Sequence, residues 1–235
     1  MAAEKGGARR VELCDALIEG GTTPSAGAIA ECKARLRIPV FVMIRPRGGD
    51  FLYSDVEYAI MRRDIAHAKS LGADGVVLGL LRRDGTVDVE RTRGLLEAAR
   101  PLPVTFHRAI DVARDAEEAL DALMAMGVDR VLTSGQAPTV GEGLDLIARL
   151  VRRAGDRIVV MPGCGIDETN VRRVVADTGV REVHVRGSAL GQSGMAHRNP
   201  RVLFRSPLPD DDLAVEVTDA ERIRRMVALV AEPPA

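Results

Sequence analysis

Two arginines and two glycines follow an apolar run near the start of the chain. The run 38–43 (IPVFVM) leads directly into Ile44–Asp55, which reads IRPRGGDFLYSD. Arginine side chains present forked, permanently charged N–H donors, and a glycine pair allows backbone conformations that other residues avoid. These residue types suit an anionic or polar ligand, so Arg45, Arg47 and Asp50 are predicted to bind substrate.

Acid–base chemistry is indicated by residues at the ends of two other apolar segments. His107 ends the segment PVTFH, four residues before Asp111, and Glu12 lies two residues before Cys14, on the same side of a strand. An unperturbed histidine titrates near neutral pH and can act as a general acid or base. We predict His107, Glu12 and Asp111 as catalytic residues. A buried Glu12 needs a partner, for which Arg45 is expected, and the alternative for His107 is a purely structural hydrogen bond to a carboxylate.

Small residues follow three later apolar segments. Gly163 and Gly165 flank Cys164, Gly187 precedes Ser188, and Ser134 lies in the sequence TSG. Glycine-rich turns after the last strands of a barrel often hold phosphate with main-chain N–H groups. We therefore predict that Ser134, Gly163, Gly165, Gly187 and Ser188 bind substrate, although glycines also simply form tight turns.

Short apolar segments alternate with longer amphipathic segments along the whole chain, which predicts one α/β domain, residues 1–235, with repeated βα units and a parallel sheet. The candidate strands are Arg10–Cys14, Pro39–Ile44, Gly75–Gly79, Pro103–His107, Arg130–Thr133, Ile158–Met161 and Glu182–Val185. The candidate helices include Ala28–Leu36, Glu117–Met126, Asp167–Val175 and Asp219–Val230, the last with Thr218 as its cap. Because a strand and most of a helix are missing before the first of these strands, we expect a TIM-like (β/α)8 barrel that lacks its first βα unit and a chain that starts late. Unpaired sheet edges would then favour association.

The composition excludes several classes of partner. The chain has 33 basic and 34 acidic residues, a net charge of -1 and no long run of one sign, so it carries neither a nucleic-acid tract nor a polybasic membrane anchor. No apolar run approaches membrane-spanning length. The three cysteines show no CxxC spacing, which favours a reducing, cytoplasmic compartment.

Several longer phrases resemble one known family. They are Arg10–Ser25 (RVELCDALIEGGTTPS), Ile38–Asp55, Pro101–Asp111 (PLPVTFHRAID), Asp129–Gly135 (DRVLTSG) and Ser193–Asn199 (SGM..RN). In this order, over nearly the whole chain, they resemble the CutC family of copper-homeostasis proteins. The resemblance implies a TIM-like barrel, a cytoplasmic location, a homo-oligomer and the handling of copper as Cu(I).

The resemblance leaves two hypotheses for the ligand. Cu(I) prefers thiolate, thioether and imidazole ligands, and Cys14 is the predicted metal ligand, although this sequence lacks the companion cysteine proposed for the family. The alternative for Cys14 is a small buried hydrophobic residue. The chain is thus either a cytoplasmic copper-homeostasis protein that binds Cu(I) at the C-terminal mouth of the barrel, or a TIM-barrel enzyme acting on a small phosphorylated or anionic metabolite. Whether it is an enzyme stays open.

Overall fold

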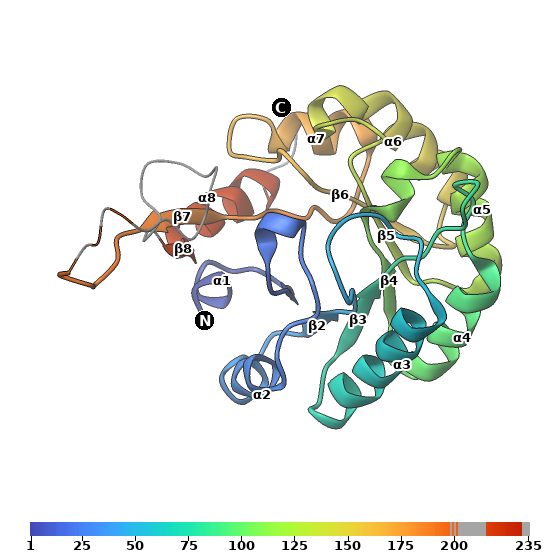
Figure 1. The fold of residues 1–235 in the computed structure, drawn as a ribbon. Coiled ribbons are helices and arrows are strands. Elements are labelled where there is room, and N and C mark those ends of the chain that lie inside the picture. The colour runs from blue at the N-terminus through green and yellow to red at the C-terminus, as the bar shows by residue number, and fades with distance from the viewer. Residues whose placement is uncertain (198, 200, 202–214, 232–235) are drawn as a thin grey trace.

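A curved parallel sheet organises the protein. The computed structural model describes residues 1–197, 199, 201 and 215–231. In this part of the chain the strands pair in the order β1-β2-β3-β4-β5-β6 and form a half-barrel with helices along its outer side (Figure 1). The strands are β1 (Val11–Leu13), β2 (Val40–Met43), β3 (Gly75–Leu78), β4 (Val104–Phe106), β5 (Arg130–Thr133) and β6 (Val159–Pro162). The predicted α/β class with repeated βα units is confirmed, as are the first six predicted strands.

Helices connect these strands. They are α1 (Ala2–Lys5), α2 (Ala26–Arg35), α3 (Asp55–Ser70), α4 (Val89–Ala99), α5 (Ala116–Met126), α6 (Val140–Ala154), α7 (Val171–Thr178) and α8 (Ala220–Ala231), with short 3-10 helices η1 (Leu17–Glu19) and η2 (Arg108–Val112). Local sequence sets their ends. Ser54 and Glu57 form a reciprocal capping box at the start of α3, and Gly127 ends α5 in the left-handed conformation.

The two sides of the sheet differ in character. Side chains that alternate outward, such as Val42, Leu78 and Phe106, join the helices in the main apolar core. The inner side carries Glu12, Cys14, Phe41, Met43, Arg45, Val77, Gly79, Thr105, His107, Leu132, Met161 and Gly163. Within it, Phe41, Met43 and Val77 form a second, smaller apolar cluster, against which Cys14 packs. The inner side is therefore where polar and sulfur-bearing groups meet.

The predicted seventh strand, Glu182–Val185, is present only as a single bridge between His184 and Gly163. Ion pairs between side chains, rather than a ladder of main-chain hydrogen bonds, hold this segment against the sheet. Glu182 binds Arg10 at 2.7 Å and Arg130 at 2.7 Å, and burial, which raises the pKa of Glu182, is outweighed by these hydrogen bonds, which lower it. The charged group on Glu182 thus links β1 and β5 to this segment.

The C-terminal part differs most from the sequence-based expectation. An antiparallel pair, β7 (Ser188–Gly191) and β8 (Val215–Thr218), projects from the body beside α8 (Figure 1). Helix α7 begins at Val171 and not at Asp167, because the Asp167 carboxylate accepts from the main-chain N–H of Thr169 in a local turn. At the start of α8, the side chain of Asp219, not that of Thr218, accepts from the main-chain N–H groups of Glu221 and Arg222. Among the described residues, no helix combines the length and apolar character needed to cross a membrane.

Candidate functional site at the mouth of the half-barrel

The inner side chains nearest the carboxyl ends of the strands form the mouth of the half-barrel, the place where sites of such folds lie. Cys14, Arg45, His107 and Gly163 come from four different strand ends. The charge of Arg45 acts on both the Cys14 thiol and the His107 imidazole. Three residues predicted separately from the sequence thus lie close together.

Cys14 is a partly buried thiol beside a carboxylate. Its Sγ donates to Glu12 Oε1 at 3.6 Å, and Glu12 Oε2 lies 3.9 Å from His184 Nδ1. Burial, followed by the charge and hydrogen bond of Glu12, raises the pKa of Cys14 far above its ordinary value, with Arg45 opposing. The thiol is therefore protonated at neutral pH. Glu12 has Cys14 and His184 as partners, whereas Arg45, its expected partner, donates elsewhere.

His107 is also buried, which changes the chemistry expected of it. Its Nδ1 accepts from the main-chain N–H of Ala109 at 3.2 Å, so Nε2 carries the proton of the neutral ring. Burial and then the charge of Arg45 lower the pKa of His107 to about 3. A desolvated imidazole beside a guanidinium stays neutral at neutral pH, and the predicted catalytic role of His107 stays a prediction. His107 can offer an N–H donor at the mouth.

Arg45 holds loops together. Its guanidinium donates to the carbonyls of Glu19 (2.6 Å), Gly21 (2.9 Å) and Gly49 (2.9 Å) and lies 5.1 Å from the centre of the Phe51 ring. Its Nε is buried without a hydrogen-bond partner among the described residues, as is His107 Nε2. The Nε–H group of Arg45 is therefore a buried donor without an acceptor among the described residues.

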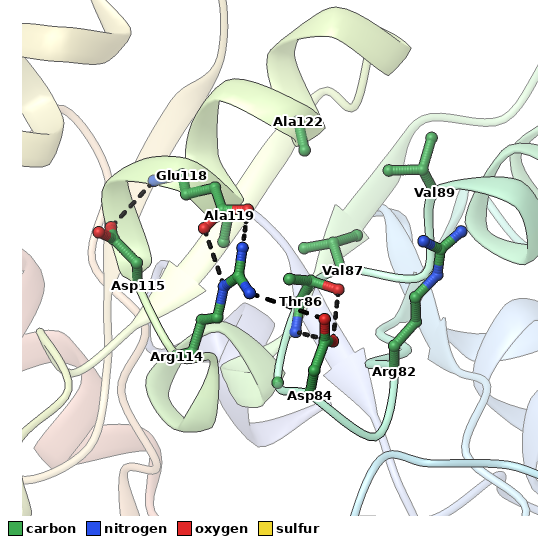
Figure 2. Close-up of a pocket in the computed structure, with 11 residues that line it drawn as sticks. Arg82, Asp84, Thr86, Val87, Val89, Arg114, Asp115, Glu118, Ala119 and Ala122 are labelled. Carbon is green, nitrogen blue, oxygen red and sulfur yellow. Dashed lines mark hydrogen bonds and ion pairs between the residues drawn. The ribbon is translucent and has the colours of Figure 1, made fainter.

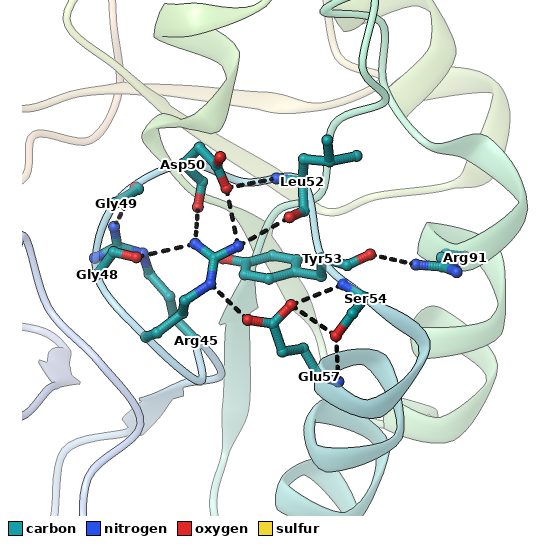
Figure 3. Close-up of polar contacts among 10 residues, drawn as sticks. Arg45, Gly48, Gly49, Asp50, Leu52, Tyr53, Ser54, Glu57 and Arg91 are labelled. Carbon is teal, nitrogen blue, oxygen red and sulfur yellow. Dashed lines mark hydrogen bonds and ion pairs between the residues drawn. The ribbon is translucent and has the colours of Figure 1, made fainter.

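Arg47 and Asp50 belong to the loop between β2 and α3, in which Asp50 lies beside Leu52 (Figure 3). Arg47 donates to Glu57 Oε1 at 2.5 Å and to Asp50 Oδ1 at 2.9 Å, and also to the carbonyls of Gly48, Asp50 and Leu52. Its guanidinium lies 5.1 Å from the centre of the Tyr53 ring. These contacts shape the loop that covers the mouth, so direct ligand binding by this pair stays a prediction.

Asp111 and Ser134 belong to a neighbouring polar cluster. The buried Asp111 carboxylate accepts from Thr133 Oγ1 (2.5 Å), the Ser134 main chain (2.9 Å), Gln136 N–H (3.2 Å) and Arg108 Nε (2.7 Å). Ser134 Oγ donates to the carbonyl of Ala137 at 2.6 Å. This saturated carboxylate joins η2 to the loop after β5, which favours a positioning role over the predicted proton transfer.

The predicted glycine positions are spread over the fold. The Gly163 N–H donates to the Thr133 carbonyl at 3.0 Å, and the Gly165 carbonyl accepts from Asn170 at 2.7 Å. Gly187 precedes β7, and Ser188, the first residue of that strand, donates its hydroxyl proton to Glu216. The structure thus places Gly163 at the mouth and Gly187 and Ser188 at the base of the projecting hairpin.

Two features of the mouth were missed at the sequence level. A Cβ on Gly79 would lie 2.5 Å from His107 Cε1 and Nδ1, so this glycine makes room for the imidazole. Phe51 lies over the mouth, with its ring centre 4.8 Å from that of His107. Phe51 and Tyr53 both occur in one short loop of a chain that is only 3% aromatic. This local enrichment in aromatic residues could have indicated that the loop covers the mouth.

A hollow of about 340 Å3 lies elsewhere, between the turn after β3 and the start of α5. There Arg114 binds Glu118 at 2.8 Å and lies 3.6 Å from Asp84 (Figure 2). Because Arg114 already pairs with both of these exposed carboxylates, the mouth is the better candidate site. Among the described residues, however, no three His, Cys, Asp or Glu side chains are grouped to hold a metal ion.

Comparisons with known proteins agree on one family. The CutC family model matches residues 1–189. The chain is 49% identical to the human copper homeostasis protein cutC homolog, over 97% of this chain and 83% of that protein. It is 47% identical to a family protein CutC from Parabacteroides distasonis, over 96% of this chain and 93% of the relative.

Solved structures support the same assignment. The structure of CutC from Streptococcus agalactiae matches with a TM-score of 0.73 and 42% identity, over 75% of this chain and 87% of that one. Thiamine phosphate pyrophosphorylase from Pyrococcus furiosus matches with a TM-score of 0.57 at 16% identity, over 98% of this chain and 86% of that one. The latter likeness shows only a TIM-barrel-like fold. The chain belongs to the CutC family.

Proposed function

We propose that this protein takes part in copper homeostasis by binding Cu(I) at the mouth of the half-barrel, with the Cys14 thiolate as its central ligand. The observation that carries this proposal is a thiol next to a thioether on the inner side of the sheet. A Cβ on Gly21 would lie 3.2 Å from Cys14 Sγ and 3.5 Å from Met43 Cε, so the two sulfur-bearing side chains are neighbours. Soft sulfur donors of this kind select Cu(I) over harder cations.

The surroundings fit a cargo ion with few ligands. The imidazole of His184 is linked to this group through Glu12, since its Nδ1 lies 3.9 Å from Glu12 Oε2. Since fewer than three of the usual charged or imidazole ligands gather here among the described residues, the ion would be held mainly by sulfur. Cys14, Cys32 and Cys164 are all free thiols, which supports a cytoplasmic location.

Competition for Cu(I) between the protein and a chromophoric chelator, under anaerobic reducing conditions, tests the proposal. We expect binding of about one ion per chain, loss of binding in Cys14→Ser, and weaker binding in Met43→Leu. Cys32→Ser is the matched control, because Cys32 lies in α2 and its loss should leave the affinity unchanged. Wild-type affinity in a folded Cys14→Ser variant would exclude a site centred on this thiol.

A second candidate ligand is a small anion. The observation in its favour is that Arg45 Nε and His107 Nε2 are buried donors without a partner among the described residues, and such donors are costly unless an acceptor reaches them. The oxygens of a bound carboxylate or phosphate group would supply the missing acceptors. Phosphate should then raise the melting temperature of the wild-type protein but not of His107→Asn, and an equal rise in both would remove His107 from such a site.

A further inference from the structure

Two buried donors lie close to the ring of Phe51. The centre of this ring is 5.1 Å from the guanidinium carbon of Arg45 and 4.8 Å from the centre of the His107 imidazole. Arg45 Nε and His107 Nε2 are both buried without a hydrogen-bond partner among the described residues. Burying a donor without an acceptor is costly, so these two N–H groups indicate a ligand that carries acceptor atoms. Phe51 itself is only partly buried.

The same guanidinium lies next to the two sulfur-bearing side chains. Arg45 Nη1 donates to the carbonyl of Gly21 at 2.9 Å. A Cβ on Gly21 would lie 3.2 Å from Cys14 Sγ and 3.5 Å from Met43 Cε. One glycine residue thus binds the guanidinium through its carbonyl and borders both sulfur-bearing side chains with its α-carbon. Donors that suit an anion and sulfur atoms that suit Cu(I) therefore belong to one site.

The sulfur atoms of this site leave room for a further ligand. Cys14 supplies a thiol and Met43 a thioether, whereas Cys32 lies in α2 and the Cys164 thiol donates to the carbonyl of Pro138. No group of three His, Cys, Asp or Glu side chains occurs in the part of the chain that the structure describes. Cu(I) prefers thiolate ligands, so an ion bound here can take a second thiolate from outside the protein.

We propose that Cu(I) binds together with a small thiol that carries a carboxylate group. The sulfur of this thiol completes the ligands of the ion, and its carboxylate oxygens supply the acceptors that Arg45 Nε and His107 Nε2 lack. A guanidinium forms strong hydrogen bonds to carboxylates, and the neutral imidazole of His107 adds a donor without a second positive charge. The Phe51 ring moves to admit the carboxylate and then covers it. This inference rests on the proposed Cu(I) site at Cys14.

The ion enters by ligand exchange, without oxidation or reduction. In a complex of Cu(I) with two such thiolates, one Cu–S bond breaks as a new bond forms to Cys14 Sγ. The departing thiolate takes the proton of the Cys14 thiol and leaves as a thiol, while the other thiolate stays on the ion. Atoms and charge therefore balance with the Cu(I) complex as the only reactant.

Anaerobic equilibrium dialysis of the full chain tests the inference, with Cu(I) supplied as its complex with radiolabelled mercaptoacetate. Copper and label are both counted, and about one of each is expected per chain. Mercaptoethanol and cysteamine are the matched probes, because they carry a hydroxyl and an ammonium group in place of the carboxylate. Their dissociation constants from the copper-loaded chain should be at least about tenfold higher than that of mercaptoacetate.

Two substitutions at His107 separate the roles of its ring nitrogens. His107→Asn keeps an acceptor for the Ala109 N–H but lacks the donor at the position of Nε2, whereas His107→Gln places an amide N–H there. The dissociation constant of mercaptoacetate should rise about tenfold in His107→Asn and clearly less in His107→Gln. Cys32→Ser is the control, since this thiol lies in α2 and its loss should change neither count.

Copper retained without mercaptoacetate, or equal retention of all three thiols by the wild-type chain, would overturn the inference and leave the proposed Cu(I) site in place. A folded His107→Asn variant with the wild-type dissociation constant would also overturn it. A chain that retains no copper from any of the complexes would overturn this inference together with the proposed function. Because the three thiols are compared on the wild-type protein, that test does not depend on the folding of a variant.

Discussion

The imidazole of His107 occupies the space that a side chain at Gly79 would fill. A Cβ at that glycine would lie 2.5 Å from two ring atoms of His107 and 3.0 Å from the Ala109 Cβ. Gly79 follows β3 and His107 follows β4 on the inner side of the sheet, so the missing side chain of one strand end allows the buried ring of the next.

Gly79→Ala is therefore expected to displace His107. Overpacking a filled interior costs about 1–3 kcal/mol, so the free energy of unfolding in urea should fall by about that amount. Gly27→Ala provides the control, because Gly27 is exposed in α2 and its nearest outside atom is 3.9 Å from the added Cβ. There, alanine should stabilise the helix by about 0.5–1 kcal/mol. Equal effects at both positions would show that the ring does not fill the space beside Gly79.

His107 should contribute to acid unfolding. Its pKa is about 3 in the folded protein and about 6.5 in the unfolded chain. The unfolded state therefore binds the proton first, and the contribution of neutral His107 to stability is complete above pH about 6.5 and is lost as the pH falls towards 3. The wild-type free energy of unfolding should fall by about 1.4 kcal/mol per pH unit from this group alone between pH about 6 and 4.

His107→Asn keeps an acceptor for the Ala109 N–H and removes this titration. Its unfolding free energy should depend less steeply on pH by that amount, whatever its value at pH 7. Urea denaturation of both proteins at several pH values measures the two slopes. Parallel slopes would contradict a buried neutral imidazole.

Residue type and period-two alternation predicted the mouth well. Cys14, Arg45 and His107 end apolar segments, and the parallel sheet brings them together. What these groups bind inside the protein was not predictable, because the carbonyls of Glu19 and Gly49, which hold Arg45, come from loops whose course depends on the whole fold.

The projecting hairpin was unpredictable for a related reason. Ser188–Gly191 pairs with Val215–Thr218, and the two segments are far apart in the sequence with no short turn to mark a hairpin. The segment Glu182–Val185 has the composition of a strand, but it forms only one bridge to β6. This was not predictable, because strand formation depends on neighbouring strands that the local composition does not describe.

Arg45→Lys should be strongly destabilising. A lysine keeps the charge but cannot reach three carbonyls at once with a planar fork. Because hydrogen bonds to charged groups contribute about 1.5–3 kcal/mol each, the free energy of unfolding should fall by about 2–4 kcal/mol. Arg47→Lys on the half-exposed rim is the comparison, with an expected loss of about 1 kcal/mol or less. A larger effect at Arg47 would mean that the rim, not the buried guanidinium, holds the loop over the mouth.

Binding of Cu(I) by Cys14 should release a proton over an unusually wide pH range. Burial and the neighbouring Glu12 raise the pKa of this thiol well above its ordinary value, so the ion must displace a proton throughout the neutral and mildly alkaline range. Apparent affinity should then rise about tenfold per pH unit, and the rise should continue beyond pH about 8.5, where an ordinary thiol is already ionised. Chelator competition at pH values from about 6 to 9, corrected for the titration of the chelator, measures this slope.

The variant Glu12→Gln is the control. It lacks the carboxylate that helps to raise the pKa of the thiol, so the rise in affinity should level off at a lower pH than in the wild type. A wild-type affinity independent of pH above 7 would mean that the thiolate exists before the ion arrives, which would contradict the raised pKa of a Cys14 thiol that is partly buried and paired with Glu12.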